Sequence, residues 1–523
     1  MAVMNKIPKT LASLGTANAK AWVADNEKFI KAVIDKHDAQ VTEMEVEKYQ
    51  QAYDGYLESV DLREKNRGDD TNYKLFVNLS QLIIDTVVDY LIAKPPIYTV
   101  EDNEQADADT TEAEIVKEYR KEILGLLQKE EAQLVLAEQL RQGSIGGYSV
   151  VIAWVDEEGA IDFAEFPIQE AIPVFNTRGK LKLLIRKYEV EVEDESGQSD
   201  KLLKLEIYDD KYVTYLVGNA NGDGYELDPD EQETGNPVEH KAGRIPCSIF
   251  INATPARYDK RVKKAGTSDL GNGVFTMLEA YAHGLSDKAN LADYLQDQYL
   301  LLKGVDTDEK EVVKMRKARA IALKSDKSDA SFIAQSQEDT AVENYLIRLR
   351  DTIHDVTFTP KINDLQGATA TEIKMKYAPL DIKAGKKELF FVVALKQLIE
   401  VLTDFLNAKK LKLAVPYDLL HDKAAVLKRA DIYRPEWLTF QLNRNLPQNF
   451  KEIADIVAEL SDKVPDSYLY ELLWFMDDPV KALAEMKKQK ADKLEAETKA
   501  GIAAMGYGSE FTGTGSTNTD VTK

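Results

Sequence analysis

The sequence offers few residues whose type and spacing could support catalysis. It contains no G-x-x-x-x-G-K-[ST] phosphate loop, and it also lacks the H-E-x-x-H, C-x-x-C and G-x-S-x-G motifs. The stretch from Gly143 to Gly147 has neither the lysine that a phosphate loop needs nor the spacing of a nucleophile elbow. Gly143 is therefore expected to end a helix ahead of a tight entry into a strand.

Metal-binding residues are equally sparse. The histidines are widely separated in the chain: His37, His240, His283, His354 and His421. Because metal sites usually include at least one close pair of ligands, neither a metal nor a cofactor is expected. The acidic pairs Asp209-Asp210 and Asp477-Asp478 could serve a magnesium-dependent nuclease or nucleotidyl-transfer enzyme, which stays open as an alternative. Such pairs are more often solvated turns.

Composition limits the partners of the chain. With 90 acidic and 67 basic residues, the net charge is −23, whereas a protein that grips DNA by its phosphates usually has a basic face. An acidic surface does suit a conduit past which DNA must slide. Charge that merely keeps the protein soluble is the other reading, and charge alone does not separate the two.

Length and hydropathy place the chain among ordinary globular proteins. Its 523 residues predict two to four compact units, and 44% of them are hydrophobic. No apolar run reaches the roughly 18 residues of a membrane span, so no membrane association is expected. Residues 1–26 have no secretory-type apolar stretch, which favours folding in a cytoplasm. The single cysteine, Cys247, sits in a strand-like setting typical of a buried thiol.

Hydrophobic periodicity divides the chain into helical and strand-rich parts. Leu79 to Leu91 has helical spacing, and a second helix is expected from Thr111 towards Gln142. Alternating residues then predict a β-rich insert at about 148–250, with strands expected at 148–155, 160–166, 181–192, 202–208 and 212–217. The fold class is therefore α+β and mainly helical.

The second half predicts two long helices around a small module. A stripe from Val274 to Leu295 gives a helix of about 28 residues, roughly 42 Å long, and a second stripe runs from Val342 to Ile353. The residues between them read as a strand at 299–302, a helix at 309–319 and strands at 320–323 and 331–334. A further long helix, broken near Pro379, should run from Ala370 towards Ala408, followed by a helical region beyond Pro435.

Four stretches together resemble the portal proteins of tailed bacteriophages, in particular the siphovirus branch from Gram-positive hosts. Their order and spacing along the chain carry the resemblance. They are Asn78-Leu79 to Lys94-Pro95-Pro96-Ile97, with Ala93 where the family usually has glycine; Gly143 to Tyr148 with Val150 to Asp156 and Gly159; Gly266-Thr267-Ser268-Asp269-Leu270 with Leu278, Ala280-Tyr281 and Ser286; and Phe440 to Pro447 with Asp477-Asp478-Pro479.

The resemblance implies a portal-type subunit with wing, two-helix stem, small clip and helical crown. The parts it implies are a wing at 1–265, a first stem helix at 266–297, a clip at 298–336, a second stem helix at 337–355, a tunnel loop at 356–369, a long broken helix and wing return at 370–435, a crown at 436–505 and a disordered tail at 506–523.

The same resemblance implies sites and partners. Lys361, Asn363 and Gln366 of the tunnel loop would face double-stranded DNA, and the clip residues Lys310, Lys314, Arg316 and Lys317 would bind partners. Those partners would be the terminase large subunit and a head-completion or adaptor protein, beside major capsid and scaffolding proteins. The chain would be no enzyme but one of twelve subunits of a homo-oligomeric ring, assembled in the host cytoplasm and carried in the virion. A helical scaffold that forms no ring is a third reading.

Overall fold

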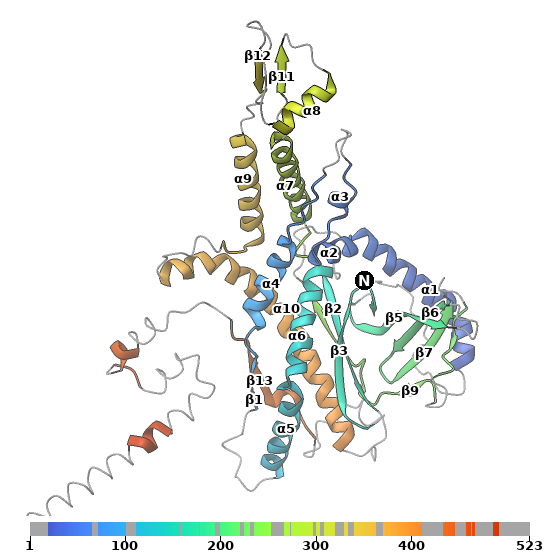
Figure 1. Ribbon diagram of the computed structural model, residues 1–523. Coiled ribbons are helices and arrows are strands. Elements are labelled where there is room, and N and C mark those ends of the chain that lie inside the picture. Colours follow the sequence, from blue (N-terminus) through green and yellow to red (C-terminus); the bar gives the residue numbers. More distant parts are fainter. Residues whose placement is uncertain are drawn as a thin grey trace, which may run out of the picture. The chain divides into compact units, whose positions relative to one another are not determined.

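A computed structural model gives the fold of most of the chain (Figure 1). It describes residues 19–64, 72–100, 111–156, 158–176, 178–193, 199–219, 224–230, 235–252, 266–271, 273–296, 300–303, 308–318, 329–332, 339–361, 370–410, 432–444, 457–461, 463–465 and 485–490. Helices and strands both contribute, with helices predominating, which confirms the α+β, mainly helical class. The chain divides into a large unit, 1–365 with 376–445, and a smaller one, 366–375 with 446–523.

Among the described residues, ten α-helices have defined bounds, and residues 457–460 and 485–490 are helical as well. The ten helices are α1 (Ala19–Glu43), α2 (Val46–Tyr53), α3 (Glu58–Asp61), α4 (Leu79–Ile92), α5 (Thr111–Leu127), α6 (Glu130–Gly146), α7 (Val274–Gln296), α8 (Glu309–Ala318), α9 (Asp339–Thr357) and α10 (Ala370–Lys410). A 3-10 turn, η4, covers Pro435–Trp437.

The described strands form four antiparallel groups. The largest sheet has the order β4 (Ala171–Phe175), β5 (Leu181–Glu193), β6 (Ser199–Tyr208), β7 (Tyr212–Asn219) and β8 (Glu226–Leu227), with β9 (Val238–Glu239) also on β7. The others are β10 (Cys247–Ile251) with β2 (Tyr148–Val155) and β3 (Ile161–Pro167); β11 (Leu300–Lys303) with β12 (Asp329–Phe332); and β1 (Ile97–Val100) with β13 (Leu438–Gln441). The five strands expected in the insert are all present, and β4 was not foreseen.

The large sheet is covered on both faces. Val33 and Ile34 of α1 pack with Leu205 and Ile207 of β6 on one face, and Figure 1 shows α1 running along this sheet. The opposite face meets β2 and β10 in a second core that includes the buried Cys247. Alternation along β6 thus sends its apolar residues to α1, as its sequence pattern predicts, and the buried position of the cysteine is confirmed.

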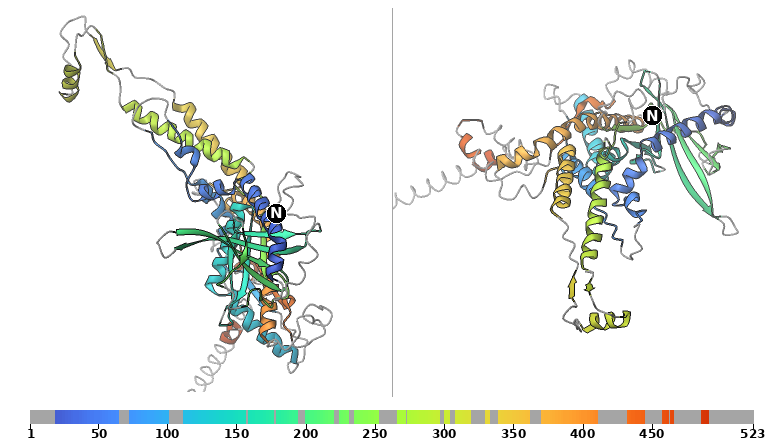
Figure 2. Two further views of the ribbon diagram at one scale, coloured as in Figure 1. Left: turned by 90° about the vertical axis from the view of Figure 1, so that its right-hand side faces the viewer. Right: turned by 90° about the horizontal axis from the view of Figure 1, so that it is seen from above.

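Helices α7 and α9 lie side by side and carry a small module at their far end. Leu346 of α9 packs so close to Gly284 of α7 that a Cβ there would be 2.7 Å from its Cδ2. Lys288 and Glu343 form an ion pair between the two helices. The β11–β12 pair and α8 lie beyond the helix ends, as both views of Figure 2 show. The predicted helix, module, helix order is therefore present.

Three sequence-based predictions are corrected here. The helix expected from Thr111 to Gln142 is two helices, α5 and α6. Gly143 does not end α6, which continues to Gly146 and is capped by Gly147 at φ +93°. Glycine is needed at position 143 because of close packing, since a Cβ there would be 2.4 Å from a ring carbon of Phe250. Pro379 lies inside α10 and does not divide it.

The start of the expected crown is also different. Residues Leu438–Gln441, predicted as helical, form strand β13 paired with β1 of the large unit. The smaller unit begins only at Leu446 in this part of the chain. The expected tail at 506–523 lies outside the described residues. In the part of the chain that the structure describes, none of the helices is both long and apolar enough to cross a membrane.

Candidate functional site: a buried ion-pair junction on helix α10

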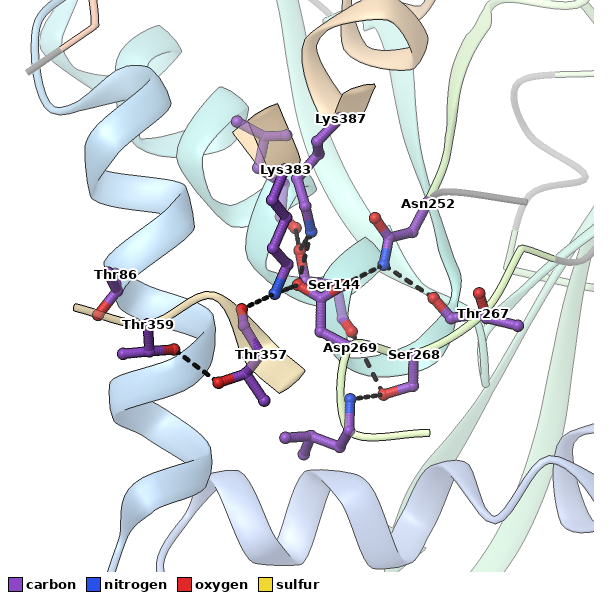
Figure 3. Close-up of polar contacts among 12 residues, drawn as sticks. Thr86, Ser144, Asn252, Thr267, Ser268, Asp269, Thr357, Thr359, Lys383 and Lys387 are labelled. Atoms are coloured by element: carbon purple, nitrogen blue, oxygen red, sulfur yellow. Dashed lines mark hydrogen bonds and ion pairs between the residues drawn. The ribbon is translucent and has the colours of Figure 1, made fainter. Parts of the chain in front are cut away.

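Among the described residues of the large unit, an unusual polar group is a lysine buried in the middle of α10. The Lys387 side chain is 2% exposed, and its Nζ lies 2.9 Å from Oδ2 of Asp269, which is 8% exposed. The same ammonium group donates a hydrogen bond to Oγ of Ser144 at 2.6 Å. Lys383, one helical turn earlier, has its Nζ 3.3 Å from the same carboxylate oxygen. Figure 3 shows both lysines pointing towards Asp269.

The carboxylate is positioned by the end of helix α6. The Asp269 N–H donates to the carbonyl oxygen of Ser144 at 2.9 Å, which satisfies a carbonyl of the last helical turn. Asn252 donates its backbone N–H to the Gly147 carbonyl, also at 2.9 Å, and its side-chain amide to Oδ1 of Asp269 at 3.0 Å. The segment that starts at Gly266 therefore caps α6 and presents Asp269 to α10.

The junction also holds the end of α9. The ammonium group of Lys383 donates to the carbonyl oxygen of Thr357, the last residue of α9, at 3.2 Å. Oγ1 of Thr357 lies 2.9 Å from that of Thr359, and both side chains are buried. Four chain segments that are distant in sequence thus meet at one cluster of charges: the end of α6, the segment before α7, the end of α9 and the middle of α10 (Figure 3).

Burial and charge act in opposite directions on this cluster. Burial alone would raise the pKa of Asp269, but Lys383 and Lys387 outweigh it and hold that pKa well below its usual range. Burial lowers the pKa of Lys387 to about 8, although the adjacent carboxylate opposes this shift. At neutral pH both partners are therefore charged, and each depends on the other for compensation.

A second ion-pair cluster connects α10 with the segment after β13. The Arg444 guanidinium pairs with Asp381, and its Nη2 lies 2.6 Å from Oε2 of Glu388, both on α10. The hydroxyl of Tyr90 in α4 donates to Asp381 Oδ1 at 2.8 Å. Helix α10 therefore bonds to one residue from each of the four stretches singled out in the sequence: Tyr90, Ser144, Asp269 and Arg444.

The residues predicted to act as sites do not gather here. Lys361, from the expected tunnel loop, is described, and its Nζ lies 3.0 Å from Oδ1 of Asp351 on α9. Asn363 and Gln366 lie outside the described residues. Lys310, Lys314 and Lys317 are exposed on α8, and the side chain of Arg316 lies outside the description. The binding roles predicted for these residues therefore stay predictions.

The acidic residues considered for magnesium show another role where they are described. The buried carboxylate of Asp209 accepts hydrogen bonds from the N–H groups of Lys211 and Tyr212, at 2.7 and 2.6 Å, so it closes the β6–β7 turn. Asp477 and Asp478 lie outside the described residues. Among the side chains that the structure describes, no group of three or more potential ligands could hold a metal ion.

Sequence reasoning missed the pairing at the centre of the junction. Asp269 stands in one of the four motif stretches, but Lys387 was not singled out. A signal was present, because Lys387 lies four residues before Phe391 on the buried face of α10. A charged residue at such a position predicts a buried partner, yet the sequence does not say which of the many acidic residues it is.

Comparison with known proteins identifies the family of this chain. Residues 31–496 match the family of phage portal proteins described as SPP1 Gp6-like, and the chain belongs to that family. The portal protein of Bacillus phage SPP1 is 24% identical over 399 residues, which is 71% of this chain and 71% of that relative.

Membership of this family settles the class of function. The chain is a phage portal protein, a component of the virion and part of an oligomer at a capsid vertex. The family is structural and not enzymatic, so the magnesium-dependent enzyme and the scaffold that forms no ring are not favoured. The resemblance found in the four sequence stretches is confirmed.

Proposed function

We propose that twelve copies of this chain close into a ring through which double-stranded DNA passes during packaging, retention and ejection of the genome. The observation that carries this is the pair α7 and α9 with a small module at its end, because two such helices suit a stem and the module suits a clip. A single heterologous contact, repeated around an axis, closes such a ring.

We propose that the chain binds the DNA phosphates only weakly. An acidic chain of net charge −23 does not cling to phosphates. Lys361, Asn363 and Gln366 are proposed to face the DNA from the tunnel loop. The pairing of Lys361 with Asp351 supports the same view, because it leaves this lysine partly neutralised. Replaceable polar contacts of this kind suit a loop that must let the duplex slide.

The remaining assignments follow the same scheme. Residues up to 265 with 370–435 are proposed as the wing, and the crown expected at 436–505 is proposed to lie after strand β13, in the part of the smaller unit at 446–505. Major capsid and scaffolding proteins would surround the ring after its assembly in the host cytoplasm. The terminase large subunit would supply ATP hydrolysis, which agrees with the missing phosphate loop in this sequence.

Imaging of the purified full-length chain tests the ring directly. We expect negative-stain particles with a central hole wide enough for double-stranded DNA, and a particle mass equal to twelve chains. A weak, salt-insensitive interaction with linear duplex DNA is expected, because few phosphates are neutralised. Particles without such a hole at every protein and salt concentration would overturn the proposal.

The clip assignment has its own test. Lys310, Lys314 and Lys317 have a spacing of four and three residues on α8, which places them on one exposed face. We propose that this face, with Arg316, docks an acidic surface of the terminase large subunit or of an adaptor protein. Replacing the three lysines with glutamate should leave ring assembly unchanged and reduce terminase binding at least tenfold, measured by interferometry at fixed salt.

A matched control separates the clip from a general effect of charge. Lys117, Lys121 and Lys129 are exposed on and after α5, and their replacement with glutamate changes the net charge equally. This control should bind terminase like the wild type. Equal losses in both triple variants would reject the clip face as the docking site.

A further inference from the structure

An extended segment lies along α7 and leaves large apolar side chains uncovered. The N–H of Tyr73 donates to Oδ1 of Asn290 at 2.8 Å, and the N–H of Leu75 donates to Oγ of Ser286 at 3.0 Å. The backbone of this segment is thus fixed on the polar face of α7, while its side chains turn outward. The strap patch comprises Tyr56 (37% exposed), Leu62 (67%), Tyr73 (42%), Leu75 (38%) and Phe76 (39%).

The strap patch is a formed surface and not a set of isolated side chains. The rings of Tyr56 and Phe76 stack with centroids 5.8 Å apart. Leu62 follows directly on α3, and the next residue, Arg63, pairs with Asp287 of α7. A pocket of about 300 Å³ adjoins the patch, and Tyr56 and Leu62 contribute to its lining. Tyr56, Leu62 and Phe76 thus form one exposed apolar surface, and such surfaces usually mark an interaction site.

Helix α9 exposes a second apolar surface. Tyr345 is 54% exposed and Val356 is 49% exposed. These two residues and the exposed Thr352 have spacings of seven and four, which places them along one line of the helix. This α9 patch, Tyr345, Thr352 and Val356, does not face α7, because Leu346 and Ile353 are the residues of α9 that are buried there.

The two patches lie on opposite flanks of α7 at the same level. Ser286 and Asn290 hold the strap, whereas Gly284 and Lys288 contact α9. At about 100° per residue, positions two apart point roughly 200° away from each other while differing in height by about 3 Å. Figure 1 shows α3 and α9 on either side of α7.

We propose that the strap patch of one subunit binds the α9 patch of the next subunit in the ring. A ring needs two unlike surfaces on opposite flanks of each subunit at equal height, and these two meet that condition. The occupant of each patch is therefore a second copy of this chain. The contact deepens the proposed function and rests on the ring described there.

The exposed charges around the two patches favour this pairing. Asp54, Glu58 and Glu64 are exposed near the strap patch, against the two exposed bases Lys48 and Lys74. Helix α9 exposes Arg348 and Arg350, and of its described acids Asp355 is exposed while Glu343 and Asp351 are paired with Lys288 and Lys361. The unpaired exposed charge is thus more acidic at the strap than on α9, which favours α9 of a neighbour over a second strap.

Alanine substitutions at the two patches test the contact in the full-length chain. Leu62→Ala and Tyr345→Ala should leave the thermal unfolding midpoint of the subunit nearly unchanged, since both side chains are largely exposed. Each should raise the protein concentration needed for half-maximal ring assembly at least tenfold, measured by mass photometry. Leu134→Ala on α6, where the side chain is 70% exposed, is the control and should assemble like the wild type.

Cross-linking distinguishes this contact from the ring itself. A Leu62→Cys/Tyr345→Cys chain treated with a short bis-maleimide should give a ladder of multimers up to the full ring, because each neighbour is joined at an unlike position. The single-cysteine variants should give no ladder, and the native Cys247 is buried. The contact, but not the ring, would be overturned if the wild type formed rings while the double-cysteine chain gave no ladder and both alanine variants assembled normally. A wild-type chain that never forms rings would overturn both.

Discussion

Asp269→Asn is expected to destabilise the folded chain by about 3–5 kcal/mol, among the largest effects of any single substitution in this protein. The amide keeps the shape of the side chain but removes the charge opposite Lys387, which is 2% exposed, and opposite Lys383. Two ammonium groups would then share a buried space without a counter-charge. The measurement is the unfolding midpoint in denaturant, compared with the wild type at equal protein concentration.

Lys387→Met is the matched control for this prediction. It leaves Asp269 with Lys383 at 3.3 Å and with the Asn252 amide at 3.0 Å, so we expect a smaller cost of about 1–2 kcal/mol. The Asp269→Asn/Lys387→Met double variant should be more stable than Asp269→Asn alone, because it removes the fully buried charge. If the Asp269→Asn chain were as stable as the Lys387→Met chain, the proposed dependence of the two buried lysines on the charge of Asp269 would be contradicted.

The pH dependence of this contribution has a definite sign. The pKa of Asp269 is held well below its ordinary value of 3.8 in the folded chain. Its stabilising contribution is therefore fully present above that ordinary value and is lost as the pH falls through the folded pKa. The difference between the wild type and Asp269→Asn should accordingly shrink in strong acid.

Gly266→Ala is expected to cost at least about 3 kcal/mol, for a steric reason. The backbone of Gly266 has φ +64°, and a Cβ there would be 1.9 Å from the Gly147 carbonyl oxygen and 2.7 Å from that of Asn252. Both obstacles are backbone atoms, and the Gly147 carbonyl also accepts the Asn252 N–H at the end of α6, so neither can move aside easily. We expect a lower unfolding midpoint and a lower yield of soluble chain.

Gly273→Ala separates the steric effect from backbone strain. Gly273 also has a positive φ, +86°, but a Cβ there would meet nothing within 4 Å. Only the conformational penalty remains, about 1 kcal/mol. If both variants were destabilised equally, the close approach of the Gly266 segment to α6 would not matter, and its capping role would be wrong.

The buried junction gives the portal architecture a mechanical basis. Lys383 ties the end of α9 to α10, and Asp269 ties α10 to the segment that leads into α7. Both helices of the proposed stem are therefore anchored at one buried point. Displacement of either helix would break charge-assisted hydrogen bonds between buried groups, which is costly, so the junction resists independent movement of the two helices.

The sequence by itself determined most of the elements. Alternation placed the strands of the insert, including Leu205 and Ile207 towards the core, and helical periodicity found α7, α9 and α10. These patterns are local, since each depends on residues within two or four positions. The order of the four motif stretches also indicated the portal family, and the match over residues 31–496 confirms it.

Only the tertiary structure decided which residues meet. Gly143 was interpreted as a helix end, but a glycine is required there because the ring of Phe250, more than one hundred positions away, leaves no room for a Cβ. The Leu438–Gln441 segment pairs as a strand with β1, although its local sequence was taken as helical. Lys387 lies 118 positions from Asp269 and 243 from Ser144. Local periodicity fixes which face of an element is buried, but a buried charge finds its partner only when the chain has folded, because the geometry that compensates it is assembled from distant segments.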